Sequence, residues 1–168
     1  QSIDAVAADV QAGLTRWNVT TRWAGGTVSR THVNGFEIGG RRIPQNFTLT
    51  VDEPFELCGT NTHPNPQQYL MAAMNACMMV GYVAVASLMG VELESVEIES
   101  EGEIDLRGFF GLDSTVKPGY DSLHYTVRIK GNGTAEQFRK IHETVMATSP
   151  NRYNIANPIR LTADLVVQ

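Results

Sequence analysis

The first apolar positions of the chain follow a helical period that later gives way to a strand pattern. Residues 3–14 repeat apolar side chains at helical spacing after Ser2 as N-cap, which predicts a short amphipathic helix in an N-terminal segment 1–16. Residues 17–60 then contain runs of β-branched and aromatic side chains, interrupted by Gly25–Gly26, Asn34–Gly35 and Gly39–Gly40. Such runs, with glycine turns between them, predict a meander of antiparallel strands.

A long helix is predicted in the middle of the chain, within residues 65–90. Asn65 is the expected N-cap, Pro66 occupies the first helical position, and Gln68 falls where it can cap back. Gly90 is expected to end the helix. Apolar side chains cover nearly every face of this segment, so we expect it to be buried on all sides. One protomer of this size can hardly surround such a helix alone, which favours a dimer.

The remaining residues, 91–168, predict strands at 91–106, 123–129 and 159–167, with a second helix before the last of them. Thr134 and Gln137 form a capping box at the start of that helix, and Ser149–Pro150 ends it. The order is helix, strands, long helix, two strands, helix and strand. We therefore expect an α+β fold with mainly antiparallel strands, as a single domain over residues 1–168.

Composition and charge exclude several classes of protein. The formal net charge is −5, and no cluster of Lys and Arg exists that could follow a phosphate backbone, so no nucleic-acid partner is expected. The longest apolar stretch, residues 69–89, is interrupted by Asn75, Gly81 and Ser87, so no membrane partner is expected. The N-terminus shows no basic, apolar leader pattern. Two cysteines without disulfide or zinc spacing favour reduced thiols in a cytoplasmic protein with no metal and no cofactor.

Cys77 lies in the middle of the predicted central helix and has two interpretations. Cysteine packs as a small hydrophobe, so it can be an inert core residue. A peroxide-reactive thiol instead requires an environment that favours the thiolate, together with space for the peroxide. His142, beside the apolar stripe of the second helix, either faces such a site or lies half-buried at the surface.

The sequence around Cys77 resembles a known family signature, which favours the reactive interpretation of this cysteine. Asn65-Pro66-Gln67-Gln68-Tyr69-Leu70 and Ala72-Ala73-Met74-Asn75-Ala76-Cys77 resemble the signature of the OsmC/Ohr family, in which an Asn-Pro-Glu helix start leads to small residues and a reactive cysteine. Asp52-Glu53-Pro54 before the helix and Glu101-Gly102-Glu103-Ile104-Asp105-Leu106-Arg107-Gly108 after it are also similar to OsmC-like proteins. The order of elements agrees from about residue 18 to the end of the chain.

The resemblance implies an intertwined homodimer with active sites at its interface. It also implies that Cys77 reduces organic hydroperoxides, assisted by an arginine and a glutamate. The apolar surface of the central helix favours a small hydrophobic hydroperoxide as the substrate. In the family a second cysteine, just before a proline at the end of the second helix, resolves the oxidised thiol as a disulfide. The matching position here is Ser149, and the helix-start glutamate is replaced by Gln67 or Gln68.

These departures leave several roles open. Cys58, in the loop before the central helix, is either a substitute resolving residue or a chance loop cysteine. We expect Arg30 to be the assisting cation, with Arg22 as the alternative, and Gln68 to take part in the site.

Two functions remain possible, so whether the chain is an enzyme stays open. The first is a thiol-dependent hydroperoxide reductase of peroxiredoxin type, recycled by an external thiol reductant. The second is a dimer that binds a small ligand or senses redox state without turnover, because it lacks the resolving cysteine.

Overall fold

The computed structural model describes residues 3–167 and has an α+β architecture with antiparallel sheets, as the sequence predicts. The chain forms two compact units. The first unit ends at Tyr69, and the second begins at Leu70. The helix α2 (Pro66–Leu88) starts in the first unit and continues into the second.

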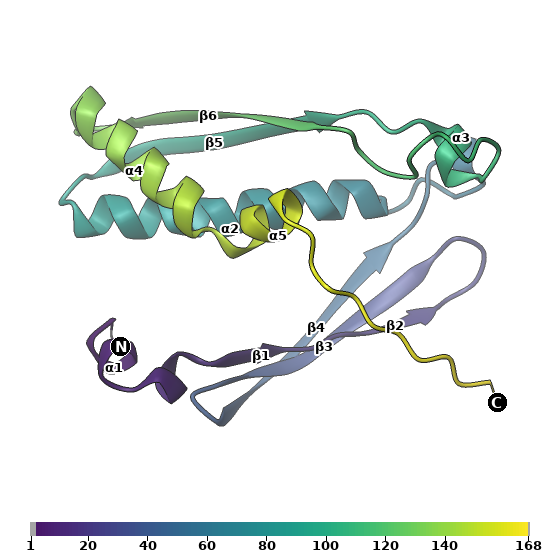
Figure 1. Ribbon diagram of the computed structural model, residues 1–168, viewed down its shortest axis with the longest axis horizontal. Helices are drawn as coiled ribbons and strands as arrows, with labels where there is room; N and C mark the ends of the chain where they lie inside the picture. Colours follow the sequence, from purple (N-terminus) through teal and green to yellow (C-terminus); the bar gives the residue numbers. More distant parts are fainter. Residues whose placement is uncertain (1–2, 168) are drawn as a thin grey trace. The chain divides into compact units, whose positions relative to one another are not determined.

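The first unit contains a four-stranded antiparallel sheet built around one long central strand (Figure 1). Strand β3 (Ser29–Ile38) pairs along one edge with β1 (Thr15–Trp17) and then β2 (Thr20–Trp23), and along the other with β4 (Arg41–Val51). The predicted antiparallel meander is therefore confirmed.

Two glycine positions explain how this sheet turns and bends. Gly39 and Gly40 have φ angles of 54° and 72° and form the tight connection between β3 and β4, a conformation that glycine adopts without steric cost. The prediction of a turn at Asn34–Gly35 is wrong, because both residues lie inside β3 at a shift in register with β4. Gly35 has a φ of 132°, and a Cβ there would lie 2.3 Å from the carbonyl oxygen of Ile43.

The N-terminal segment differs from the single helix predicted over residues 3–14. It forms a short helix, α1 (Ile3–Ala8), and a separate 3₁₀ turn over Val10–Gly13. Asp9 divides them, because its extended backbone and its side chain, which accepts from the Gln11 N–H at 2.9 Å, start a new turn. Strand β1 begins at Thr15, inside the segment assigned to the helix, and Ser2 lies outside the described residues.

The ends of α2 follow the sequence prediction. The side chain of Asn65 accepts from the Gln68 N–H at 3.0 Å, while the Gln68 side chain accepts from the Asn65 N–H at 2.9 Å. This reciprocal capping box satisfies two donors that the first turn of a helix leaves free. At the other end Gly90 adopts a φ of 67°, and the Val91 N–H donates to the Ala86 carbonyl. These contacts terminate the helix as expected.

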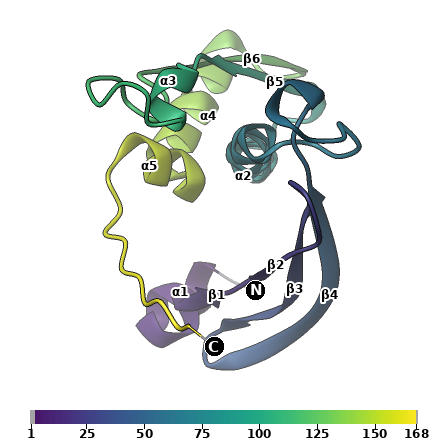
Figure 2. The same cartoon turned by 90° about the vertical axis from the view of Figure 1, so that its right-hand side faces the viewer.

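The second unit packs one stripe of α2 against a sheet and another helix (Figure 2). The sheet pairs β5 (Leu93–Gly102) with β6 (Leu123–Gly131), and the helix is α4 (Ala135–Thr148), which begins at the predicted Thr134–Gln137 capping box. Gly81 of α2 permits a close approach, since a Cβ there would lie 3.2 Å from Val145 of α4. The core comprises Met74, Met78, Tyr82, Ala86, Val91, Ile141 and Val145.

Burial of α2 in one chain is limited to that stripe. The side chains of Val80, Val83 and Leu88 remain 70%, 55% and 72% exposed, although the sequence predicts burial on all sides. By length and composition alone α2 could cross a membrane. A stripe with a period of four residues packed against a sheet and α4 is instead the arrangement of a core helix.

Three segments that follow α2 differ from the sequence prediction. Strand β5 stops at Gly102, short of the predicted residue 106, and Asp105 then caps a short helix, α3 (Leu106–Phe109). After α4 the chain forms another helix, α5 (Pro150–Ala156), which the sequence analysis missed. Residues 159–167 were expected to form a strand, but they have no sheet partner in the described chain. An isolated alternating segment cannot form a ladder without an edge to pair with.

Candidate functional site

Cys77 and Ser149 meet although 72 positions separate them in sequence. Cys77 lies on α2, and Ser149 lies where α4 ends and α5 begins. The Ser149 hydroxyl donates to Cys77 Sγ at 3.5 Å. Ser149 is only 5% exposed, and Cys77 is half-buried. The structure therefore brings together two of the residues that the sequence analysis selected.

Side-chain amides fix the elements on either side of Cys77. Asn151 Nδ2 donates to the carbonyl oxygen of Ala73, one turn before Cys77, at 2.9 Å and so ties the start of α5 to α2. Asn75 Nδ2 donates to the Ile98 carbonyl at 3.3 Å, and its Oδ1 accepts from the Ser100 hydroxyl at 2.7 Å, which ties α2 to β5. These bonds limit the freedom of the cysteine's backbone.

The other site residues predicted from the sequence belong to the first unit. Gln68 uses its side chain in the helix cap. Arg30 is exposed in β3, and the alternative Arg22 lies directly opposite it in β2. Cys58 is exposed and has a left-handed backbone with a φ of 63°. Participation of Gln68, Arg30 or Cys58 in chemistry at Cys77 stays a prediction.

A buried carboxylate organises the loop that carries Cys58. Asp52 is fully buried, and its two oxygens accept from the Thr27 hydroxyl at 2.6 Å and from the Thr60 hydroxyl and N–H at 2.6 and 3.0 Å. These hydrogen bonds, with Thr27 the largest contributor, hold the pKa of Asp52 far below its usual range. Next to it, Glu53 Oε2 is a buried oxygen without a hydrogen-bond partner among the described residues.

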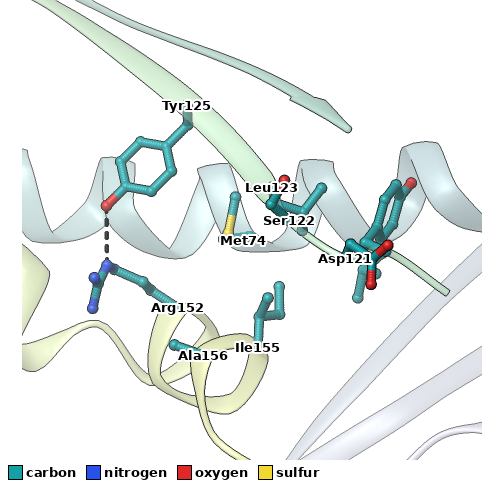
Figure 3. A pocket seen from close by; sticks show the side chains of 10 residues that line it. Met74, Asp121, Ser122, Leu123, Tyr125, Arg152, Ile155 and Ala156 are labelled. Atoms are coloured by element: carbon teal, nitrogen blue, oxygen red, sulfur yellow. Dashed lines mark hydrogen bonds between the residues drawn. The ribbon is translucent and has the colours of Figure 1, made fainter. Parts of the chain in front are cut away.

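A pocket of about 370 Å³ lies beside α5 in the second unit (Figure 3). Leu70, Met74, Leu123 and Ile155 give it apolar walls. At one end Arg152 Nε donates to the Tyr125 hydroxyl at 2.9 Å, while Arg152 Nη1 donates to the Met146 carbonyl at 2.9 Å. Asp121 and Ser122 also line the pocket. It therefore combines apolar walls with polar groups of both charges, a combination that suits an amphipathic small molecule.

A second polar contact lies within the core of this unit. Tyr82 Oη is 2.5 Å from His142 Nδ1, and the two rings are stacked. Tyr82 is 1% exposed, and its burial raises the pKa of the phenol to about 12. His142 therefore has a specific partner in the core, which favours the half-buried structural interpretation of that residue.

Arg152 and Tyr125 were not predicted as site residues from the sequence. An arginine three residues beyond Ser149 stands out only if the segment after Pro150 is recognised as a new helix. Ser before Pro is a typical helix start, but the same dipeptide also ends α4. Tyr125 has the alternating pattern of any inward-facing strand residue, so the sequence gives no signal for its contact with Arg152.

Comparison with known proteins identifies the family of the chain. A family model described as OsmC-like protein matches residues 59–164, more than half of the chain. The chain belongs to the OsmC-like family. No curated protein sequence matches it at a significant level.

Solved structures of OsmC-like proteins share the fold at low sequence identity. An OsmC-like protein from Mycoplasma pneumoniae is 12% identical with a TM-score of 0.67, covering 85% of this chain and 89% of its own. An OsmC-like hydroperoxide resistance protein from Jannaschia sp. CCS1 is 15% identical, with a TM-score of 0.50 and 91% coverage of both chains. The organic hydroperoxide resistance protein OsmC from Legionella pneumophila is 18% identical, with a TM-score of 0.51, covering 83% of this chain and 89% of its own.

Proposed function

We propose that this OsmC-like protein reduces organic hydroperoxides with Cys77 as the attacking thiol. The observation that carries the proposal is the 3.5 Å contact between Cys77 and Ser149. It joins the position of a reactive cysteine to the position before Pro150 at which the family resemblance implies a second one. Two of the similar structures are hydroperoxide resistance proteins, which supports the same substrate class.

The reaction proceeds in two steps. The Cys77 thiolate attacks the terminal oxygen of the hydroperoxide, the O–O bond breaks, and the alkoxide leaves as an alcohol after taking a proton. The sulfur is oxidised by two electrons to a sulfenic acid. An external thiol then displaces water to form a mixed disulfide, and a second thiol releases Cys77 and leaves as a disulfide.

Residues of the second unit support an apolar substrate. The pocket beside α5 has apolar walls, and Met74, one turn before Cys77 on the same helix, lines it. A hydroperoxide with a hydrocarbon substituent fits such walls better than hydrogen peroxide does, because burying its hydrocarbon surface is favourable. Arg152, which is bonded to Tyr125, places a positive charge at the polar end of the pocket.

The decisive measurement is consumption of cumene hydroperoxide with dithiothreitol as reductant. The wild-type protein should turn over, Cys77→Ser should lose both turnover and peroxide-dependent thiol loss, and Cys58→Ser should keep the first oxidation step. If Cys58→Ser alone abolished that step, the assignment of the two cysteines would be reversed. A wild-type protein that leaves the peroxide unchanged and keeps both thiols reduced would refute the proposed reaction.

A second function is favoured by the pocket itself. Its lining residues do not include Cys77, so it can hold an amphipathic ligand without any thiol chemistry. A chain without a resolving cysteine would then serve as a binding or redox-sensing protein. Single oxidation of Cys77 without continuous peroxide consumption would favour this function over turnover.

We also propose that the protein acts as a cytoplasmic homodimer. Val80 and Leu88 of α2 remain exposed, and Leu161 and Leu165 in the unpaired C-terminal segment are each 89% exposed. Apolar surface of this extent is unfavourable in water and is typical of an interface. A second copy of the chain is the partner that the family resemblance implies for these surfaces.

A further inference from the structure

Ser149 occupies a helix N-cap but does not use its side chain as a cap. It precedes Pro150, the first residue of α5, and makes no side-chain hydrogen bond to the backbone of that helix. A serine at this position normally accepts from an N–H of the first turn, which is why serine is favoured there. Here the hydroxyl points to Cys77 Sγ instead. The side chain of Ser149 therefore contacts α2 instead of capping α5.

Several polar groups on the elements around this contact are bonded elsewhere. On α5, Arg152 donates to Tyr125 and to the Met146 carbonyl. On α4, His142 pairs with Tyr82, and between α2 and β5 the Asn75 amide is bonded to Ile98 and Ser100. Glu97 and Glu99 of β5 are exposed and pair with Arg128. Among the hydrogen bonds within residues 3–167, the Ser149 hydroxyl is the donor that reaches the Cys77 sulfur.

We propose that Ser149 is a positioning residue that orients the Cys77 sulfur and favours its reactive form by donating a hydrogen bond to it. The inference rests on the proposed function of Cys77 and explains how that function is supported without a second sulfur. A hydrogen bond to a charged acceptor stabilises the charged form and is stronger than one between neutral groups. Because Ser149 is 5% exposed, water competes little for its hydroxyl. Ser149 thus takes the place of the resolving cysteine that the family resemblance implies, and it activates the thiol of Cys77 instead.

The same geometry determines how the oxidised protein is recycled. Serine has no sulfur, so the sulfenic acid formed on Cys77 has no disulfide partner at the end of α4. The hydroxyl stays beside the sulfur and leaves it open to an external thiol, which supplies the two electrons for its reduction.

The test is the pH dependence of alkylation of Cys77, measured in the full chain with Cys58→Ser so that one thiol remains. Iodoacetamide reacts with the thiolate, so its rate, followed by intact mass, rises through a midpoint as pH increases. Ser149→Ala should move that midpoint upward by about one pH unit, a roughly tenfold loss of thiolate below the midpoint. Ser149→Thr, which keeps the hydroxyl, should lie near the Ser149 protein.

Thr134→Ala provides the matched control. Thr134 caps α4 with its side chain, so its loss weakens a helix without touching the Cys77 contact. It should leave the alkylation midpoint unchanged. An unchanged midpoint in Ser149→Ala, or an equal shift in Thr134→Ala, would overturn the inference. Alkylation needs no peroxide, so a protein inactive toward hydroperoxides but shifted by Ser149→Ala would refute the proposed function and leave the role of Ser149 intact.

Discussion

Tyr82 on α2 and His142 on α4 are joined by a hydrogen bond of 2.5 Å in the core of the second unit. Burial raises the pKa of Tyr82 to about 12, so its phenol stays protonated at neutral pH and keeps its hydroxyl for this bond. The bond joins two helices whose shared core is otherwise apolar.

Tyr82→Phe should therefore destabilise the protein. It removes the hydroxyl and leaves Nδ1 of His142 without its partner, which should lower the free energy of unfolding by about 1–3 kcal/mol. Urea unfolding followed by circular dichroism measures the difference. Tyr153→Phe is the control, because Tyr153 is 62% exposed and its substitution should change little. A Tyr82→Phe variant as stable as the wild type would show that the bond contributes nothing net.

The buried carboxylate of Asp52 should make the first unit sensitive to acid. Its pKa in the folded state lies far below the usual range because Thr27 and Thr60 donate to it, whereas the unfolded chain has an ordinary value of about 3.9. A group with a depressed folded pKa stabilises the fold fully above its unfolded pKa. That contribution is lost as pH falls from about 4 toward the folded value.

Asp52→Asn should consequently be less stable than the wild type at pH 7, and the difference should narrow below about pH 4. Denaturant midpoints at pH 7 and pH 3 provide the comparison. Asp121→Asn is a suitable control, since Asp121 is exposed and pairs with Lys117 at the surface. Equal stability of Asp52→Asn and wild type at pH 7 would contradict the role of the Thr27 and Thr60 bonds.

The parts of the fold that the sequence predicts are those with local causes. The starts of α2 and α4 follow from side chains that cap within three residues, such as Asn65 with Gln68, and the end of α2 follows from the left-handed backbone of Gly90. Helix α5 escaped prediction because Ser149–Pro150 serves two helices at once. The bulge at Gly35 looked like a turn because both require the same permissive backbone.

The site was predictable only in part, because most of its contacts join residues that are distant in the sequence. The motif around Cys77 identifies one residue, and the resemblance points to Ser149, but neither gives a contact between residues 72 positions apart. Arg152 and Tyr125 depend on the packing of α5 against β6, which no local pattern encodes. The strand expected at residues 159–167 needs a partner edge, and the described chain does not pair it.

That unpaired segment leads to a prediction about assembly. Leu161 and Leu165 lie on one side of an alternating sequence and are each 89% exposed. If the segment packs on a second copy, sedimentation at micromolar concentration should give about twice the chain mass of 18.4 kDa. Leu161→Asp with Leu165→Asp should shift the protein toward monomer, because each charge would be buried without a partner. Thr162→Asp, on the other side, should keep the dimer. A folded monomer of the wild type would refute the assembly.

The contact between Cys77 and Ser149 finally makes the oxidation products predictable. Peroxide without reductant should convert Cys77 to a sulfenic and then a sulfinic acid, seen in the intact mass as gains of one and then two oxygens. Ser149→Cys should divert the sulfenic acid into a disulfide, because the two side-chain atoms already lie 3.5 Å apart and a rotamer change can bring two sulfurs to a bonding distance of about 2.05 Å. The variant should lose two hydrogens, resist the second oxygen and regain two free thiols with dithiothreitol. A wild-type protein that loses both thiols would instead show Cys58 to be the resolving residue. A Ser149→Cys variant that never forms the bond would show that the end of α4 and the middle of α2 do not meet in solution as they do in this structure.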